Sequence, residues 1–149
     1  MITRLSVVVC LVAVMAACDM GPKSAVGFRL PDGDAARGEQ SFLSLGCHSC
    51  HSVANFEAPE PLTAGPVNVV LGGQVVRVKT YGELVSSVIN PSHRIAVGSG
   101  PDAVTESGES VMRVYNDVMT VQQLIDLVAF LQTHYEVVPP EFHYPRYGY

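Results

Sequence analysis

The chain has 149 residues, of which 48% are hydrophobic and 15% charged, and its formal net charge at pH 7 is −5. This composition excludes a disordered chain and a coiled coil, and the length suits one domain with a modest core. The acidic balance argues against a nucleic-acid partner, which would need a basic surface, and favours a protein partner with a basic face.

The first 17 residues have the pattern of an export signal. Arg4 is followed by an uncharged apolar run from Leu5 to Ala17, and small residues precede Cys18. The run is too short for a membrane span, which needs roughly 20 residues. We therefore expect residues 1–17 to be a cleaved signal peptide and the mature protein to work outside the cytoplasm.

The end of this signal, "MAAC", resembles the lipobox of bacterial lipoproteins, in which the cysteine is acylated after cleavage. Met15 stands where that pattern usually has Leu. The resemblance implies that Cys18 carries a lipid anchor, that residues 18–32 are a tether, and that the protein is held at the periplasmic face of a bacterial membrane. The alternative is ordinary cleavage near Ala17, which leaves Cys18 as a free thiol.

Residues 34–45 have the pattern of an amphipathic helix. Asp34 is a suitable N-cap, and Gly38 and Phe42 fall on one face. A glycine on an apolar helix face predicts close approach by another helix.

Two further helices begin with capping boxes. Residues 80–83 open a helix that Pro91 stops, and residues 120–123 open a helix that runs to about His134. Between the first helix and these two, Gly72-Gly73 separates two β-branched runs, which predicts a small β-hairpin at about 67–79.

The motif that carries chemistry is Cys47-His48-Ser49-Cys50-His51. Cys-x-x-Cys-His is the attachment signature of c-type haem, because two thiols on one helical turn reach the two vinyl groups of a porphyrin edge and the adjacent His ligates the iron. A dithiol redox site is expected near a βαβ pattern, and a structural zinc needs a second pair of ligands. The sequence has neither, so we expect one covalent haem c.

Four stretches resemble a known family: "DAARGEQSFLSLGCHSCH", "AGP", "VINPS" and "VMTVQQLIDLVAFLQ". Their order is similar to that of class I monohaem c-type cytochromes over about residues 33–135. The resemblance implies an all-α fold, with the hairpin as an insertion, and a cytochrome c domain over 33–138 followed by an aromatic tail at 139–149. It also implies that the first and last helices cross, with Gly38 and Phe42 facing Phe130 and Leu131.

The resemblance also implies a second iron ligand, a Met from the loop before the last helix. Met112 is the candidate, because an apolar side chain in that polar loop needs a reason. Met119 is the alternative, although it precedes the helix cap where a hydrophobic staple is expected. His93 or an open position are the other possibilities. A carbonyl after the motif, here that of Pro66, is implied as the acceptor for the second ring N–H of His51, unless Gly65-Pro66 is a plain turn.

An iron with both axial positions filled by protein exchanges electrons but binds no substrate. We therefore expect a one-electron carrier, or the cytochrome subunit of a respiratory or dehydrogenase complex, and no enzymatic activity of its own. Its partners are expected to be redox proteins with a basic docking face. A haem enzyme or gas sensor with a labile sixth ligand is the alternative, and a zinc or thiol-redox protein is the third.

Overall fold

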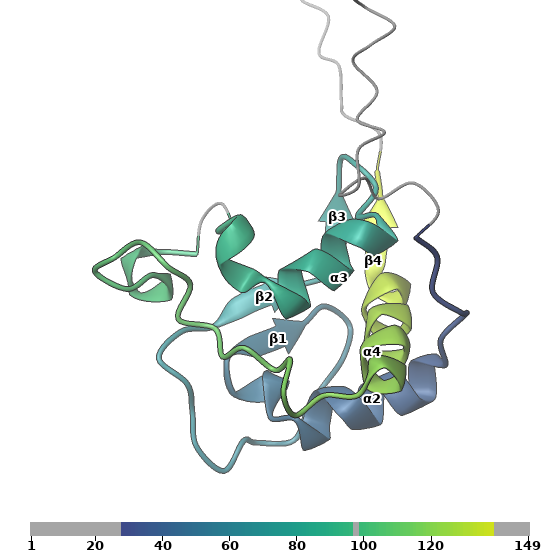
Figure 1. Ribbon diagram of the computed structural model, residues 1–149, viewed down its shortest axis with the longest axis horizontal. Coiled ribbons are helices and arrows are strands. Elements are labelled where there is room, and N and C mark those ends of the chain that lie inside the picture. Colours follow the sequence, from purple (N-terminus) through teal and green to yellow (C-terminus); the bar gives the residue numbers. More distant parts are fainter. Residues whose placement is uncertain (1–27, 97–98, 139–149) are drawn as a thin grey trace, which may run out of the picture. The chain divides into compact units, whose positions relative to one another are not determined.

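The computed structural model describes residues 28–96 and 99–138. The chain divides into two units, Met1–Leu30 and Pro31–Tyr149, and the elements below belong to the second. The signal peptide, Cys18 with most of the tether, and the aromatic tail lie outside the described residues. In chain order the elements are α2 (Ala35–Ser44), β1 (His51–Val53), β2 (Val69–Leu71), β3 (Gly73–Val75), α3 (Tyr81–Ile89), α4 (Val121–Thr133) and β4 (Tyr135–Val137) (Figure 1).

The three predicted helices are confirmed, and so are their caps. The Asp34 side chain accepts a hydrogen bond from the Arg37 backbone N–H at the start of α2. Both capping boxes are complete, with Thr80 and Glu83 on α3 and Thr120 and Gln123 on α4. Local side-chain chemistry therefore fixes where each helix begins.

The expectation of an all-α fold is wrong. Four short strands form two parallel pairs within the described residues, β1 with β2 and β3 with β4, so the chain has mixed α/β character. The hairpin at 67–79 is wrong as well, because β2 and β3 pair with different partners instead of with each other.

The reason lies at Gly72 and Gly73, which both have positive φ. The chain bends there, as predicted, but it bends toward the end of α4. The Gly73 N–H donates to the His134 carbonyl over 2.8 Å. A Cβ on Gly72 would lie only 2.6 Å from that carbonyl oxygen. The two glycines thus allow close backbone contact with α4 instead of a reversal.

The core lies where α2 crosses α4 (Figure 1). At Gly38 the helices approach so closely that a Cβ would collide with the Asp126 carbonyl oxygen. The rings of Phe42 and Phe130 pack beside the crossing with centroids 5.6 Å apart. The close approach at Gly38 and the contact between Phe42 and Phe130 are therefore confirmed.

Asp126 is a buried charge at the same crossing, with its side chain only 3% exposed. Its carboxylate accepts hydrogen bonds from the Asp34 backbone N–H at 2.7 Å and from Arg37 Nε at 2.8 Å. Arg37 Nη2 and Gln122 Nε2 also donate to it. The cluster joins the start of α2 to the middle of α4, with three donors on Oδ1 of the carboxylate and one, Arg37 Nε, on Oδ2. Of the helices described, none combines the length and apolarity that crossing a bilayer requires.

Candidate functional site

Cys47 and Cys50 lie on one turn that follows directly from α2. Gly46 has φ 73°, which lets the chain leave the helix. Cys47–Ser49 then form a 3₁₀ turn, closed by the Cys50 N–H donating to the Cys47 carbonyl over 3.2 Å. Cys50 caps this turn, three residues after Cys47, which is the spacing at which side chains of a 3₁₀ turn lie above one another. Both cysteines are free thiols and half-buried.

His51 begins β1, and its ring is oriented by the strand pair. His51 is in register with Val69 of β2, and His51 Nδ1 lies 3.2 Å from the Val69 carbonyl oxygen. A carbonyl only accepts, so Nδ1 carries the proton and Nε2 keeps its lone pair. Burial lowers the pKa of His51, although the Val69 carbonyl opposes the shift. Burial and the contact with Val69 therefore favour the uncharged ring with its proton on Nδ1.

The acceptor expected for His51 was the Pro66 carbonyl, and the structure has the Val69 carbonyl in this role. The parallel pairing of β1 with β2 explains the difference. Backbone hydrogen bonds extend this pairing at both ends. The Val69 N–H donates to the Cys50 carbonyl over 2.8 Å, and the Ala54 N–H donates to the Leu71 carbonyl. Pro66 is exposed and lies three residues before Val69, where the pairing of β1 with β2 begins.

Gly65 packs directly on the motif turn. Its N–H donates to the Ser49 carbonyl over 2.8 Å, and a Cβ at this position would collide with Cys50 Sγ. The Gly65-Pro66 loop is therefore more than a plain turn, because its glycine leaves the room that the Cys50 sulfur occupies.

The thiol of Cys47 has a pKa raised to about 11, chiefly because burial disfavours the thiolate. Dithiol redox sites depend on the opposite shift, since the thiolate is the attacking species. At neutral pH Cys47 is protonated and a poor nucleophile for disulfide exchange.

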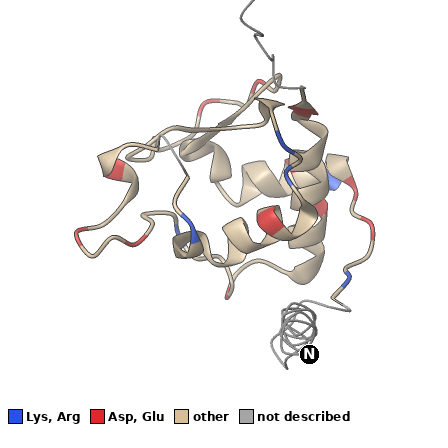
Figure 2. Ribbon diagram, turned by 90° about the horizontal axis from the view of Figure 1, so that it is seen from above, with Lys and Arg blue, Asp and Glu red and all other residues tan. Residues whose placement is uncertain are grey.

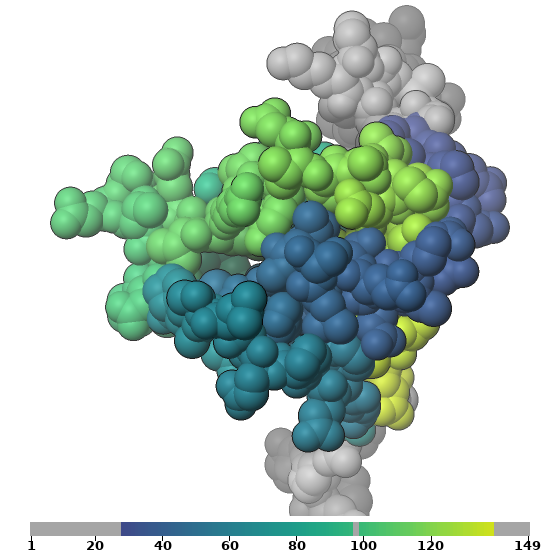
Figure 3. Space-filling model, turned by 90° about the horizontal axis from the view of Figure 1, so that it is seen from below, coloured from purple at the N-terminus to yellow at the C-terminus, as the bar shows by residue number. Residues whose placement is uncertain are grey.

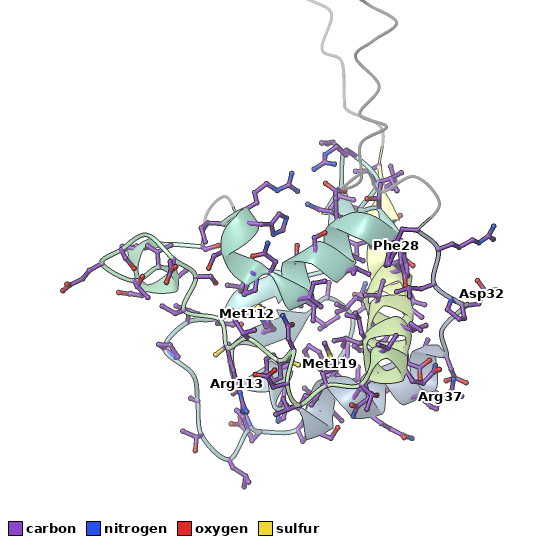
Figure 4. All side chains as sticks on the ribbon, viewed as in Figure 1. Phe28, Asp32, Arg37, Met112, Arg113 and Met119 are labelled. Carbon is purple, nitrogen blue, oxygen red and sulfur yellow. The ribbon has the colours of Figure 1, made fainter. Side chains whose placement is uncertain are left out.

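The segment that precedes α4 carries both candidate methionines, Met112 and Met119 (Figure 4). Both side chains are half-buried, although most of their neighbours on the segment are exposed. The Met112 N–H donates to Ser110 Oγ over 3.2 Å, and the Met119 N–H donates to the Tyr115 carbonyl over 2.9 Å.

Tyr115, between the two methionines, links this segment to the motif. Its hydroxyl donates to the Leu45 carbonyl over 3.1 Å, two residues before Cys47. Figure 3 shows the segment, in green, packed against the blue residues of α2 and the turn that follows it. Burial raises the pKa of Tyr115, and the nearby Cys47 and Cys50 add to the shift. The methionine-bearing segment therefore lies beside the two thiols.

Two of the other histidines, His93 and His134, have hydrogen-bond contacts through Nδ1. The exposed His93 has its Nδ1 2.6 Å from the Asn90 carbonyl, within its own turn. His134 Nδ1 lies 2.9 Å from the Ala54 carbonyl, and its ring packs 4.7 Å from that of Phe130. His48 is half-buried. His143 lies outside the described residues.

Comparison with protein-family models, with curated proteins and with solved structures gives no match for this chain. The described residues hold no group of three or more His, Cys, Asp or Glu side chains that could bind a metal ion. Ligation of an iron by one His and one Met needs no such group.

Proposed function

We propose that the protein is a c-type cytochrome that transfers single electrons. Cys47 and Cys50 would hold one covalent haem c, His51 would supply the first axial ligand, and Met112 the second. The observation that carries the proposal is the geometry of the motif: two thiols on one 3₁₀ turn beside a neutral imidazole whose Nδ1 is held by the Val69 carbonyl.

Four features of the site support the fit to this group. The donor set is that of a c-type cytochrome. Gly65 leaves space at the Cys50 sulfur. A hydrogen-bonded Nδ1 is the usual second contact of a ligating His and fixes its tautomer. The half-buried methionines offer thioether sulfur from a segment tied to the motif by Tyr115.

When bound, the haem supplies an iron that cycles between the ferrous and ferric states. The residues of this chain set the conditions for that exchange. With His51 and Met112 both bound to the iron, no position would be left for a substrate, and the thioether of Met112 would favour the reduced state. His51, oriented by the Val69 carbonyl in a strand pair, would keep its place in both states, so that little reorganisation would accompany each transfer.

A haem enzyme or gas sensor with a labile sixth ligand is the alternative, and it would need the methionine to leave. A thiol-redox role is disfavoured by the raised pKa of Cys47.

Location and partners follow from the sequence. We propose that Cys18 anchors the protein by a lipid at the periplasmic face of a bacterial membrane, and that its redox partner presents a basic face to this acidic protein. Cys18→Ser should move the protein from the membrane fraction to the soluble periplasmic fraction. Retention in the membrane fraction would argue against the lipid anchor.

The proposal is tested by expressing the full chain in cells that mature c-type cytochromes. We expect haem-linked peroxidase staining of the protein band after denaturing electrophoresis, since only covalent haem survives denaturation. Cys47→Ser and Cys50→Ser together should abolish the stain, and His93→Ala should not. An unstained wild-type band would refute the proposal, and carbon monoxide binding to the reduced protein at neutral pH would favour the alternative.

A further inference from the structure

The segment that carries Met112 and Met119 is fastened to the rest of the domain by side-chain hydrogen bonds from its own residues. Tyr115 Oη donates to the Leu45 carbonyl at the end of α2 over 3.1 Å. Asn116 Nδ2 donates to the Ile89 carbonyl at the end of α3 over 3.0 Å. Two adjacent residues thus join this segment to the ends of two different helices.

The two carbonyls that accept these bonds lie at helix ends, where backbone oxygens lack partners within the helix. Leu45 is the C-cap of α2, and Ile89 is the last residue of α3. Each bond therefore satisfies a backbone group that the helix leaves open, and it fixes the segment to a rigid element.

The backbone around Tyr115 is itself compact. The Val118 and Met119 N–H groups both donate to the Tyr115 carbonyl, over 3.0 and 2.9 Å. The Arg113 guanidinium lies over the Tyr115 ring, with Cζ 5.3 Å from the centroid. Arg113 thus packs on the residue that fastens the segment. Arg113, which follows Met112, and the turn that ends at Met119 thus both contact Tyr115.

Upstream, the Ser110 N–H donates to Ser92 Oγ over 3.1 Å, just after α3. Met112 therefore has an attachment on each side, at Ser110 and at Tyr115, with only exposed residues next to it in the chain. A side chain in an otherwise solvated loop keeps a fixed place only if the loop is held at both sides.

We propose that Tyr115 and Asn116 are positioning residues, which hold the methionine-bearing segment against the ends of α2 and α3 and so keep its thioether sulfur on the metal. The inference rests on the proposed function. Neither residue would supply a metal ligand, and both would act through the segment. Loss of either hydrogen bond would shift the segment toward a state in which the methionine sulfur is released.

The test uses the full-length holoprotein with Tyr115→Phe, which removes one oxygen and keeps the ring beneath Arg113. Carbon monoxide competes with the sulfur for the reduced metal, so its apparent affinity reports the released fraction. We expect the affinity to rise about five- to tenfold, which is what losing one such hydrogen bond does to an equilibrium. The oxidised protein should have an absorption band at the red end of the spectrum that reports the bond between sulfur and iron. As the pH is raised, this band should disappear at a lower pH in the variant than in the wild type.

Tyr135→Phe is the matched control, because the described residues offer its hydroxyl no hydrogen-bond partner. It should leave both readouts unchanged. Asn116→Asp, which removes the donor to Ile89, should shift both in the same direction as Tyr115→Phe, and it decides the question if Tyr115→Phe does not accumulate.

A wild-type protein without covalent haem would refute the proposed function. A haem-bearing wild type whose Tyr115→Phe and Asn116→Asp variants match it within twofold would refute the positioning role alone. Equal shifts in Tyr135→Phe would also overturn it, since they would show a general loosening of the domain.

Discussion

At the scale of single residues, the most demanding contact of the domain is Asp126. A buried carboxylate is tolerated only where hydrogen bonds and an opposite charge replace its water. The side-chain hydrogen bond from Arg37, with the Asp34 N–H next in importance, lowers the Asp126 pKa from 3.8 to about 2. The charge therefore belongs to the folded crossing of α2 and α4, at the start of α2 and away from the end of that helix that leads into the motif.

We predict that Asp126→Asn destabilises the holoprotein and makes its stability against unfolding depend less on pH in the acid range. The folded-state pKa lies below the unfolded value, so the carboxylate stabilises the fold above about pH 4 and this contribution is lost as the pH falls toward 2. Urea midpoints measured between pH 2 and 7 should fall in the variant above pH 4 and converge with the wild type near pH 2.

Glu83 provides a matched control for this prediction. Its pKa is also lowered to about 2, mainly by the side-chain hydrogen bond from Arg77, but its side chain is 23% exposed. Glu83→Gln keeps the capping box and loses only surface ion pairs, which contribute little. It should change the midpoints less than Asp126→Asn. If the urea midpoints of the Asp126→Asn variant and the wild type changed with pH in parallel, the Asp126 carboxylate would not be the source of the pH-dependent stability.

Side-chain patterns predicted some of these residues and missed others. The spacing of Cys47, Cys50 and His51 predicts haem attachment, and this role stays a prediction; the structure describes only the turn and the strand on which they lie. The acceptor for His51 was missed because it is a backbone carbonyl, and its position depends on strand register and not on any side chain. Asp126 left a readable signal, since it is the one charged residue in a helix that otherwise reads as a core element.

At the scale of elements, glycine decides where helices and strands approach one another. Gly38 is buried on α2, and Phe130 Cβ of α4 would lie 2.7 Å from a Cβ built there. Gly82 lies on α3 with nothing within 4 Å of such a Cβ. The same substitution therefore tests close packing at one position and helix propensity at the other.

We predict that Gly38→Ala destabilises the holoprotein by about 1–3 kcal/mol, the usual effect of overpacking. Gly82→Ala should be neutral or stabilising by up to about 1 kcal/mol, because Ala is the better helix former. Free energies of unfolding from urea titration, with the haem spectrum as a check on the site, give the comparison. Equal effects at the two positions would show that α2 and α4 do not depend on contact at Gly38.

The helices were predictable because capping boxes and apolar periodicity are local. The strands were not, because each has only three residues and pairs with a distant partner: β1 with β2 around the Gly65 loop, and β3 with β4 across all of α3 and α4. Gly72-Gly73 gave a correct bend and a wrong partner. A turn signal fixes where the chain changes direction, whereas long-range contacts decide what it meets.

At the scale of the whole molecule, the sign of the charge bears on function. The chain has a net charge of −5, and loss of Arg4 with a signal peptide would make it one unit more negative. Figure 2 shows acidic positions spread over loops and helices instead of gathered on one face. A field of this kind attracts basic reactants from all sides, with an effect that falls as salt screens it.

We predict that the sign of a reactant's charge sets how salt changes the rate of electron exchange. Oxidation of the reduced protein by the cationic tris(phenanthroline)cobalt(III) complex should slow as ionic strength rises from 10 to about 200 mM, because the Debye length shrinks from about 30 to below 10 Å. Oxidation by anionic hexacyanoferrate should become faster over the same range. Stopped-flow measurement with both reagents on one preparation separates charge from driving force, because each rate is compared only with itself at another salt concentration. If both reactions slow alike, the acidic surface does not steer reactants, and the expectation of a basic partner loses its physical ground.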